Sequence, residues 1–102
     1  MNAATSYYYK VTLPIIDTGV SNFTFSARVE NSTFTFNFQF FNNVWNVFTF
    51  FPSGEIREAQ VYPNVMAWTG FADYSLAFIK SLPIVGLNDL GSISMYMVSW
   101  RV

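Results

Sequence analysis

Hydrophobic and polar residues alternate along residues 34–40, where every second position is phenylalanine. The run reads Phe34, Thr35, Phe36, Asn37, Phe38, Gln39 and Phe40. A period of two places all the phenylalanines on one face of an extended chain, which is typical of a β-strand with one face in the core. Residues 23–29 show the same alternation, and Asn31 between the two segments tolerates the left-handed backbone of a tight turn. The pattern predicts a β-hairpin made of residues 23–29 and 33–41.

Two further strands are predicted downstream of this hairpin. Asn42 and Asn43 form a second turn signal, and residues 44–51 then carry apolar side chains at odd and even positions, which is typical of a strand covered on both faces. Residues 52–55 read Pro-Ser-Gly-Glu, a strong turn signal because proline presets φ and glycine permits a positive φ. Residues 56–62 return as a fourth strand with one polar face. Residues 23–62 are therefore predicted to form a four-stranded meander.

The pattern changes after Pro63, which ends the meander because proline cannot donate to a strand ladder. Phe71, Tyr74 and Phe78 recur at helical spacing and predict a short helical turn at residues 72–78. Residues 82–87 are predicted to form a short edge strand, because Pro83 lies within them.

The two ends of the chain supply the remaining strands. Residues 92–100 predict a last strand with apolar residues on both sides, and residues 7–13 are extended up to Pro14. Six to seven short antiparallel strands with one helical turn predict a single all-β domain over residues 1–102, either a small β-sandwich or a partly open β-barrel. Residues 1–13 form its extended N-terminal arm or strand. The residues predicted to form its core are Phe34, Phe36, Phe38, Phe40 and Phe48.

The composition adds a surplus of aromatic residues to this fold. Of the 102 residues, 52% are apolar, 21% are aromatic and 11% are charged, which is the opposite of a disordered chain. The 12 Phe, 6 Tyr and 3 Trp residues exceed what one core of this size can bury. We therefore expect some aromatic surface to contact another protein, a ligand or an ordered terminus.

The chain contains neither histidine nor cysteine. Disulfides, imidazole or thiolate metal sites, and nucleophiles of the Ser-His or Cys-His type are therefore excluded. Glu55 and Glu58 are the only close carboxylate pair, and a spacing of three on a strand points them to opposite faces. Asp73 and Asp89 suit capping and turn roles. We expect a protein that is not an enzyme, with no catalytic residue, no metal and no cofactor.

Charge and hydropathy also restrict the partners. A net charge of −1 provides no field to attract nucleic acid or an anionic membrane. The most apolar window, residues 44–51, is far shorter than the roughly twenty residues of a membrane span. The start of the chain has neither the basic nor the apolar region of a secretory signal, so we expect it to stay in the cytoplasm unless it leaves within an assembly.

Carbohydrate binding is the strongest alternative from another class of function. An aromatic ring packs on the C–H face of a sugar, while neighbouring amides bond its hydroxyls. The aromatic residues that could form such a platform are Tyr7, Tyr8, Tyr9, Trp45, Trp68 and Trp100. We favour a core position for Trp45 and a docking strand for the run of tyrosines.

Both chain ends are apolar, whereas the ends of free-standing domains are usually polar. They either pair with each other inside the domain or add a strand to a neighbour's sheet, and the low charge favours a permanent assembly. If the N-terminal segment serves a neighbour, removing residues 1–9 leaves the fold intact. The predicted contact residues are all aromatic: Tyr7, Tyr8, Tyr9, Trp68, Phe71, Tyr74 and Trp100.

Short blocks follow one another in a recognisable order between about residue 7 and residue 100. They are the aromatic segment 7–13, the hairpin from Phe23-Thr24-Phe25 to Phe34-Thr35-Phe36-Asn37-Phe38, the run Val44-Trp45-Asn46-Val47-Phe48, the turn Pro52-Ser53-Gly54-Glu55, and Leu90-Gly91 before an apolar strand that contains Tyr96. In the order and spacing of these blocks, the chain resembles a family of small proteins encoded in the tail gene modules of tailed bacteriophages, sometimes labelled cyanophage-like. Residues 61–76 depart from that family's Gly- and Leu-rich pattern.

The resemblance implies a structural virion component and no catalytic residues. Such a protein is a small β-domain bound in several copies at the tail tube end or the baseplate hub, as a plug, ring or adaptor. Its expected partners are other tail or baseplate proteins and copies of itself, with no nucleic acid and no membrane insertion. Its expected location is the virion, after synthesis in the host cytoplasm. A non-catalytic carbohydrate-binding module remains the alternative.

Overall fold

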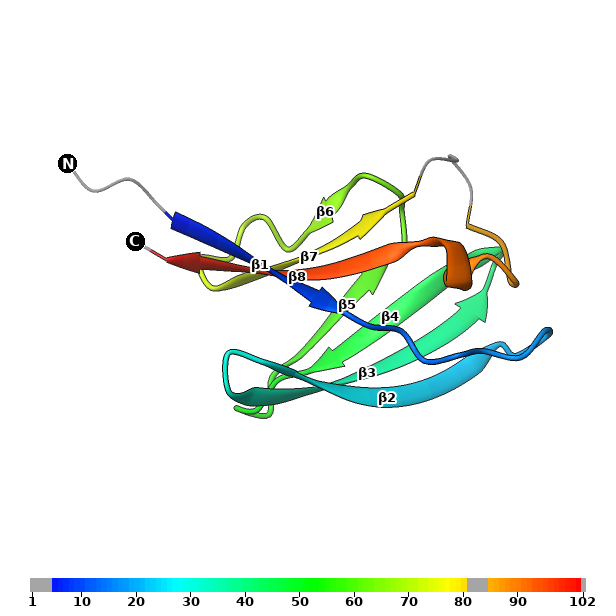
Figure 1. The fold of residues 1–102 in the computed structure, drawn as a ribbon, viewed down its shortest axis with the longest axis horizontal. Helices are drawn as coiled ribbons and strands as arrows, with labels where there is room; N and C mark the ends of the chain where they lie inside the picture. Colours follow the sequence, from blue (N-terminus) through cyan, green and yellow to red (C-terminus); the bar gives the residue numbers. More distant parts are fainter. Residues whose placement is uncertain (1–4, 81–84, 102) are drawn as a thin grey trace.

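Two four-stranded antiparallel sheets lie face to face in this protein (Figure 1). A computed structural model describes residues 5–80 and 85–101. Sheet I has the order β1-β8-β7-β6 and contains β1 (Thr5–Val11), β6 (Met66–Ala67), β7 (Tyr74–Ile79) and β8 (Ser94–Arg101). Sheet II has the order β2-β3-β4-β5 and contains β2 (Asn22–Val29), β3 (Ser32–Phe41), β4 (Val44–Phe50) and β5 (Ile56–Gln60). Because the two sheets stay separate, the architecture is the predicted β-sandwich rather than the partly open barrel.

Sheet II confirms the predicted meander. Glu30 and Asn31 join β2 to β3 with φ values of 53° and 64°, and Asn42 and Asn43 join β3 to β4 with φ values of 53° and 61°. Both connections are two-residue turns with left-handed central residues, which match the natural twist of a hairpin. Asparagine occupies three of these four positions because its side chain tolerates that conformation.

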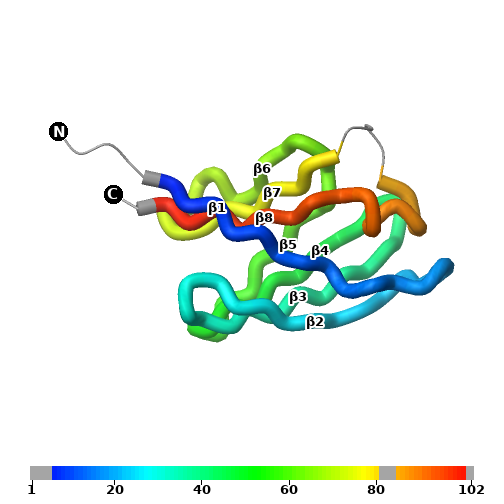
Figure 2. The backbone as a smooth tube through the Cα atoms, in the orientation of Figure 1, coloured from blue at the N-terminus to red at the C-terminus, as the bar shows by residue number. Residues whose placement is uncertain are grey.

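Sheet I brings the two ends of the chain together. β1 pairs with β8 along its whole length, from Thr5 opposite Arg101 to Val11 opposite Met95. Figure 2 shows the two strands side by side, with the start of β1 beside the end of β8. Of the two alternatives for the chain ends, pairing inside the domain is therefore the one observed, and residues 5–11 are a strand of the sandwich.

The core lies between the two inner faces. Phe34, Phe36 and Phe38 on β3 are fully buried, as the alternation predicts, and the ring of Phe38 meets that of Phe78 on β7 edge to face at 6.5 Å between centroids. Trp45 is also fully buried, as expected. The other buried apolar residues that face this layer from sheet I include Leu76, Met95 and Met97.

Two of the predicted core residues behave differently from the rest. Phe40 is half-buried and packs against the core, whereas Phe48 does not lie in the core. Phe48 pairs with Asn37 on one side and Glu58 on the other, so it shares the outer, polar face of sheet II. The prediction was wrong because both parities of β4 are apolar, and only the pairing with β3 decides which parity faces inward.

The predicted helical turn at residues 72–78 is also wrong, because this segment enters strand β7. Tyr74, Leu76 and Phe78 alternate with period two as well, and the whole segment from Tyr74 to Ile79 pairs antiparallel with β8. The helical turn in the described part of the chain is a 3-10 turn at Leu90–Ser92.

The described residues contain eight strands, against six to seven predicted: the two-residue β6 has no sequence signal, and β7 occupies the segment predicted to be a helical turn. The edge strand predicted at residues 82–87 falls partly on 82–84, outside the described residues, while residues 85–87 are not in a strand.

Candidate docking surface

The seven predicted contact residues divide into two groups in the structure. Tyr7, Tyr8 and Phe71 are exposed, at 47%, 61% and 50% of their surface. The other four are half-buried and make hydrogen bonds within the chain: Tyr9, Trp68, Tyr74 and Trp100. Only the first group therefore presents aromatic surface that is largely available to a partner.

Tyr9 and Tyr74 hold the β2–β3 turn against sheet I. The hydroxyl of Tyr9 donates to one carboxylate oxygen of Glu30 at 3.1 Å, and that of Tyr74 donates to the other at 2.9 Å. Burial raises the pKa of Tyr74, and the negative charge of Asp73 raises it further. The two phenols and the carboxylate thus form a polar clasp between the sheets.

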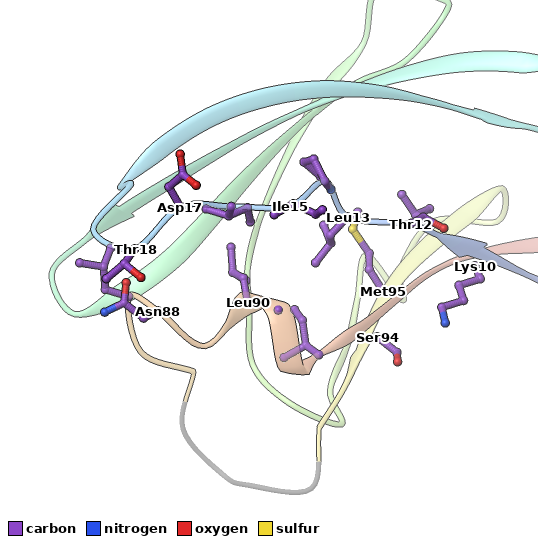
Figure 3. A pocket seen from close by; sticks show the side chains of 16 residues that line it. Lys10, Thr12, Leu13, Ile15, Asp17, Thr18, Asn88, Leu90, Ser94 and Met95 are labelled. Atoms are coloured by element: carbon purple, nitrogen blue, oxygen red, sulfur yellow. The ribbon is translucent and has the colours of Figure 1, made fainter.

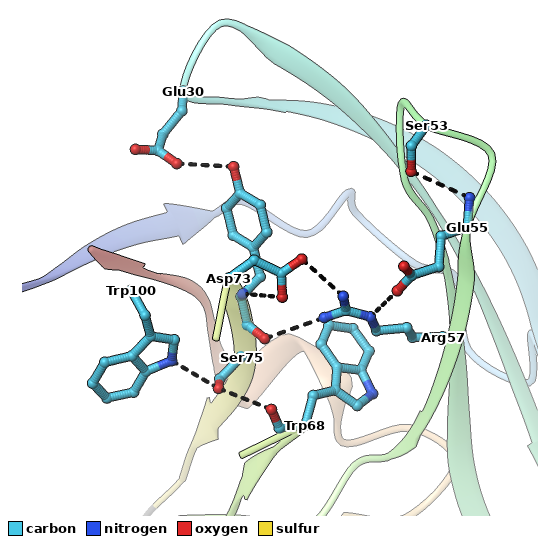
Figure 4. Close-up of polar contacts among 9 residues, drawn as sticks. Glu30, Ser53, Glu55, Arg57, Trp68, Asp73, Ser75 and Trp100 are labelled. Atoms are coloured by element: carbon cyan, nitrogen blue, oxygen red, sulfur yellow. Dashed lines mark hydrogen bonds and ion pairs between the residues drawn. The ribbon is translucent and has the colours of Figure 1, made fainter. Parts of the chain in front are cut away.

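Arg57 forms a second polar connection between the sheets (Figure 4). It lies on the inner face of β5, opposite the buried Thr49, and binds Glu55 and, at 2.9 Å, Asp73. Burial lowers the pKa of Arg57, but hydrogen bonds to these carboxylates outweigh that effect and raise it. The hydrogen bond from Arg57 lowers the pKa of Asp73. A cation held between two carboxylates has a structural role.

The guanidinium of Arg57 also contacts the ring of Phe71, one of the exposed aromatic residues. Its central carbon lies 4.3 Å from the ring centroid of Phe51 and 4.0 Å from that of Phe71. Stacking of Arg57 on these rings is a cation–π arrangement. Phe71 is therefore held in place by Arg57 while its outer side stays exposed.

Trp68 and Trp100 are tied to the sandwich at the same end. The indole of Trp100 donates to the hydroxyl of Ser75 at 2.9 Å, and that of Trp68 donates to the carbonyl of Glu58 at 3.0 Å. Both indole N–H groups are thereby used within the chain, so neither is free to donate a hydrogen bond to a sugar hydroxyl.

Apolar surface that sequence reasoning missed lies on the outer face of sheet II. Phe50 and Ile56 are cross-strand neighbours and are 40% and 56% exposed, with the half-buried Phe48 two residues away on the same face. The sequence of β4 contained a signal for this surface, because apolar side chains at both odd and even positions predicted a strand covered on both faces. Within the described residues sheet I covers one face only, so the other apolar face of β4 is available to a partner. Phe48, Phe50 and Ile56 are called the β4 patch below.

A row of amide side chains crosses the same outer face beside the β4 patch. The pairing places Asn22, Gln39, Asn46 and Gln60 in line across all four strands. Asn37 lies next to this row, and its amide donates to Asn22 at 3.0 Å and accepts from Gln39 at 2.6 Å. The amides of Asn22, Asn37 and Gln39 thus bond one another along the sheet, while that of Asn46 donates to the carbonyl of Val44 at 3.2 Å.

A groove of about 410 Å3 opens where Val11 pairs with Met95, at the end of the β1–β8 pair that lies away from Thr5 and Arg101 (Figure 3). Leu13, Ile15, Leu90 and Met95 supply apolar walls, and Figure 3 shows them between the chain that follows β1 and the 3-10 turn. The backbone N–H of Gly19 donates to Asn88 at 2.9 Å and closes one end. The groove contains no paired acid and base.

The described residues contain no group of three or more acidic side chains that could hold a metal ion. Among the same residues, no helix is long and apolar enough to cross a membrane. No family model, no curated protein and no solved structure matches this chain. The surface itself therefore carries the functional argument.

Proposed function

We propose that this protein is a structural component of a tailed-phage virion, acting as a tail or baseplate plug, ring or adaptor that docks on neighbouring proteins. The observation that carries the docking role is the β4 patch, an apolar row on the outer face of a sheet whose inner face already forms the core. The resemblance of the sequence blocks to tail-module proteins supports the virion setting. Arg57 and Glu30, the charged residues that connect the two sheets, are already bound within the chain.

Burial of apolar surface supplies the energy for such docking. Each Å2 of apolar surface removed from water contributes about 25 cal/mol. Phe48, Phe50 and Ile56 lie on adjacent strands of a rigid sheet, so they lose little backbone freedom when a partner covers them. With a net charge of −1, the chain also presents little electrostatic repulsion to a second protein.

The experiment compares virions assembled with the unchanged chain and with two double variants. Phe50→Asp/Ile56→Asp places two charges on the β4 patch, and Thr24→Asp/Thr33→Asp places two charges at exposed positions of β2 and β3 on the same face. We expect the first variant to fold, as circular dichroism and thermal melting report, and to be lost from purified particles. The second should still be incorporated. Purified virions that lack the unchanged chain would refute the proposal.

A carbohydrate-binding module is the second candidate, and the amide row favours it. Asn22, Gln39 and Gln60 place amide donors and acceptors in line beside the ring of Phe48, the combination that binds sugar hydroxyls and C–H faces. Isothermal titration calorimetry with an oligosaccharide panel separates the two candidates. The structural proposal predicts no heat of binding, whereas binding that Gln39→Ala abolishes would reverse the ranking.

A further inference from the structure

β1 is an edge strand of sheet I, and within the described residues β8 is its only neighbour. The backbone N–H of Trp100 donates to the carbonyl of Asp73 at 2.8 Å, on the β7 side of β8. Backbone polar groups alternate sides along an antiparallel strand, so Ser99 and Met97 direct theirs toward β1. Their partners there are Tyr7 and Tyr9. The backbone groups of Ser6, Tyr8 and Lys10 therefore point away from the sheet.

This edge carries few of the features that normally prevent strands from pairing with another chain. β1 contains no proline, its register with β8 runs without a bulge, and Lys10 is its only charged residue. Tyr8, the central residue of the outward set, is 61% exposed.

The other three edge segments are less suited to pairing. β6 has only two residues, and β5 has five and carries Arg57 and Glu58. β2 is long, but its outer side chains are engaged with β3: the amide of Asn37 donates to Thr24 at 2.9 Å, and the hydroxyls of Ser26 and Thr35 share a hydrogen bond of 2.9 Å.

The outward residues are symmetric about Tyr8, and this symmetry suits a two-fold axis. When β1 pairs antiparallel with β1 of a second copy about that axis, Tyr8 faces Tyr8 and Ser6 faces Lys10. Each of these pairs consists of outward-pointing residues, so each can exchange two backbone hydrogen bonds. A shift that placed Lys10 opposite Lys10 would set like charges together and shorten the overlap.

We infer that the β1 edge binds a second copy of this chain, which joins the two copies of sheet I into one continuous antiparallel sheet. The facing Tyr8 rings add an aromatic cross-strand contact, and Lys10 is placed against an uncharged serine. The two-fold contact is isologous, because the same edge serves both copies. This inference rests on the proposed docking function and names one of its partners.

Amide hydrogen exchange at high and low protein concentration tests the paired strand directly. In the isolated chain, the N–H groups of Tyr7 and Tyr9 are protected by β8, whereas those of Ser6, Tyr8 and Lys10 exchange rapidly. At concentrations where sedimentation gives twice the chain mass, we expect the second set to become protected. A dimer in which these three amides still exchange rapidly would overturn the inference.

Charge exchange at the two-fold axis provides the second measurement. Tyr8→Lys and Tyr8→Glu should each raise the dimer dissociation constant roughly tenfold or more, since like charges then face each other. An equimolar mixture of the two should recover a heterodimer, because opposite charges then face each other. Tyr62→Lys changes another exposed tyrosine, away from the edge, and should leave the dimer unchanged. Equal weakening by Tyr62→Lys, or no recovery in the mixture, would contradict pairing about Tyr8.

The outcome separates this inference from the proposed function. A chain that is monomeric at all concentrations, yet enters virions through the β4 patch, would refute the β1 pairing and leave the structural role standing. A chain that dimerises through β1 but is missing from purified virions would support the β1 pairing and refute the structural role in the virion.

Discussion

Arg57 on β5 donates a hydrogen bond of 2.9 Å to the carboxylate of Asp73, which directly precedes β7. The contact joins sheet II to sheet I at the end of the sandwich where Phe71 is exposed. Since the Arg57 side chain is only 6% exposed, its charge depends on this partner and on Glu55 for compensation.

Replacing Arg57 should destabilise the fold. Arg57→Ala removes two ion pairs and the stacking on Phe51 and Phe71, and we expect the free energy of unfolding to fall by about 2 kcal/mol. Arg57→Met keeps most of the side-chain volume and should cost less. Urea denaturation of both variants measures the difference, and equal losses would mean that the charge rather than the packing carries the effect.

Protonation of Asp73 in acid should lower the free energy of unfolding. Its pKa is lower in the folded than in the unfolded chain, because Arg57 donates a hydrogen bond to it. The contribution to stability is therefore present above the unfolded pKa, about 3.9, and is lost as pH falls through the lower folded value. Urea denaturation from about pH 6 down to pH 2 should show a smaller loss for Asp73→Asn than for the unchanged chain.

A double-mutant cycle tests the cause of this acid sensitivity. In an Arg57→Met background, Asp73 has lost its hydrogen-bond donor, so Asp73→Asn should change the pH profile little further. If the two substitutions instead had fully additive effects on the profile, the ion pair would not be its source.

Glu30 should contribute through both of its tyrosine partners. Glu30→Gln replaces a charged acceptor of two phenol hydroxyls with a neutral amide, and we expect a loss of about 1 to 2 kcal/mol in the free energy of unfolding. Glu58→Gln makes the same chemical change at an exposed position on β5 and serves as the control. Thermal and urea denaturation compare the two, and an equal effect at both positions would argue against the clasp.

Deleting residues 1–9 should unfold or strongly destabilise the domain. The deletion removes most of β1, including Tyr9, and leaves one edge of β8 unpaired beside the buried Met97. This reverses the sequence-based expectation that the fold would survive, because that expectation assigned the segment to a neighbour's sheet. Deleting residues 1–4 leaves all of β1 in place and should preserve the cooperative transition seen by circular dichroism. A folded product of the longer deletion would show that β1 is dispensable.

Much of sheet II could be predicted because its information is local. The alternation of phenylalanine over residues 34–40 and the asparagines of the turns specify a strand, its buried face and its connections within a few residues. Tyr7 and Tyr8, two of the predicted contact residues, are exposed, but they are consecutive strand residues that point to opposite faces, so no local alternation specified their exposure.

The remaining features depend on contacts between residues far apart in the chain. Tyr74 and Phe78 fit a helical or an extended pattern, and pairing with β8 selected the strand. The outer position of Phe48 and Phe50 followed from the register between β3 and β4. The sequence by itself thus determined the all-β class, the meander and the buried phenylalanines of β3, since period and turn chemistry act over short distances. Only the tertiary structure decided the pairing of β1 with β8 and which aromatic rings face outward, because those choices are made by partners that no local pattern specifies.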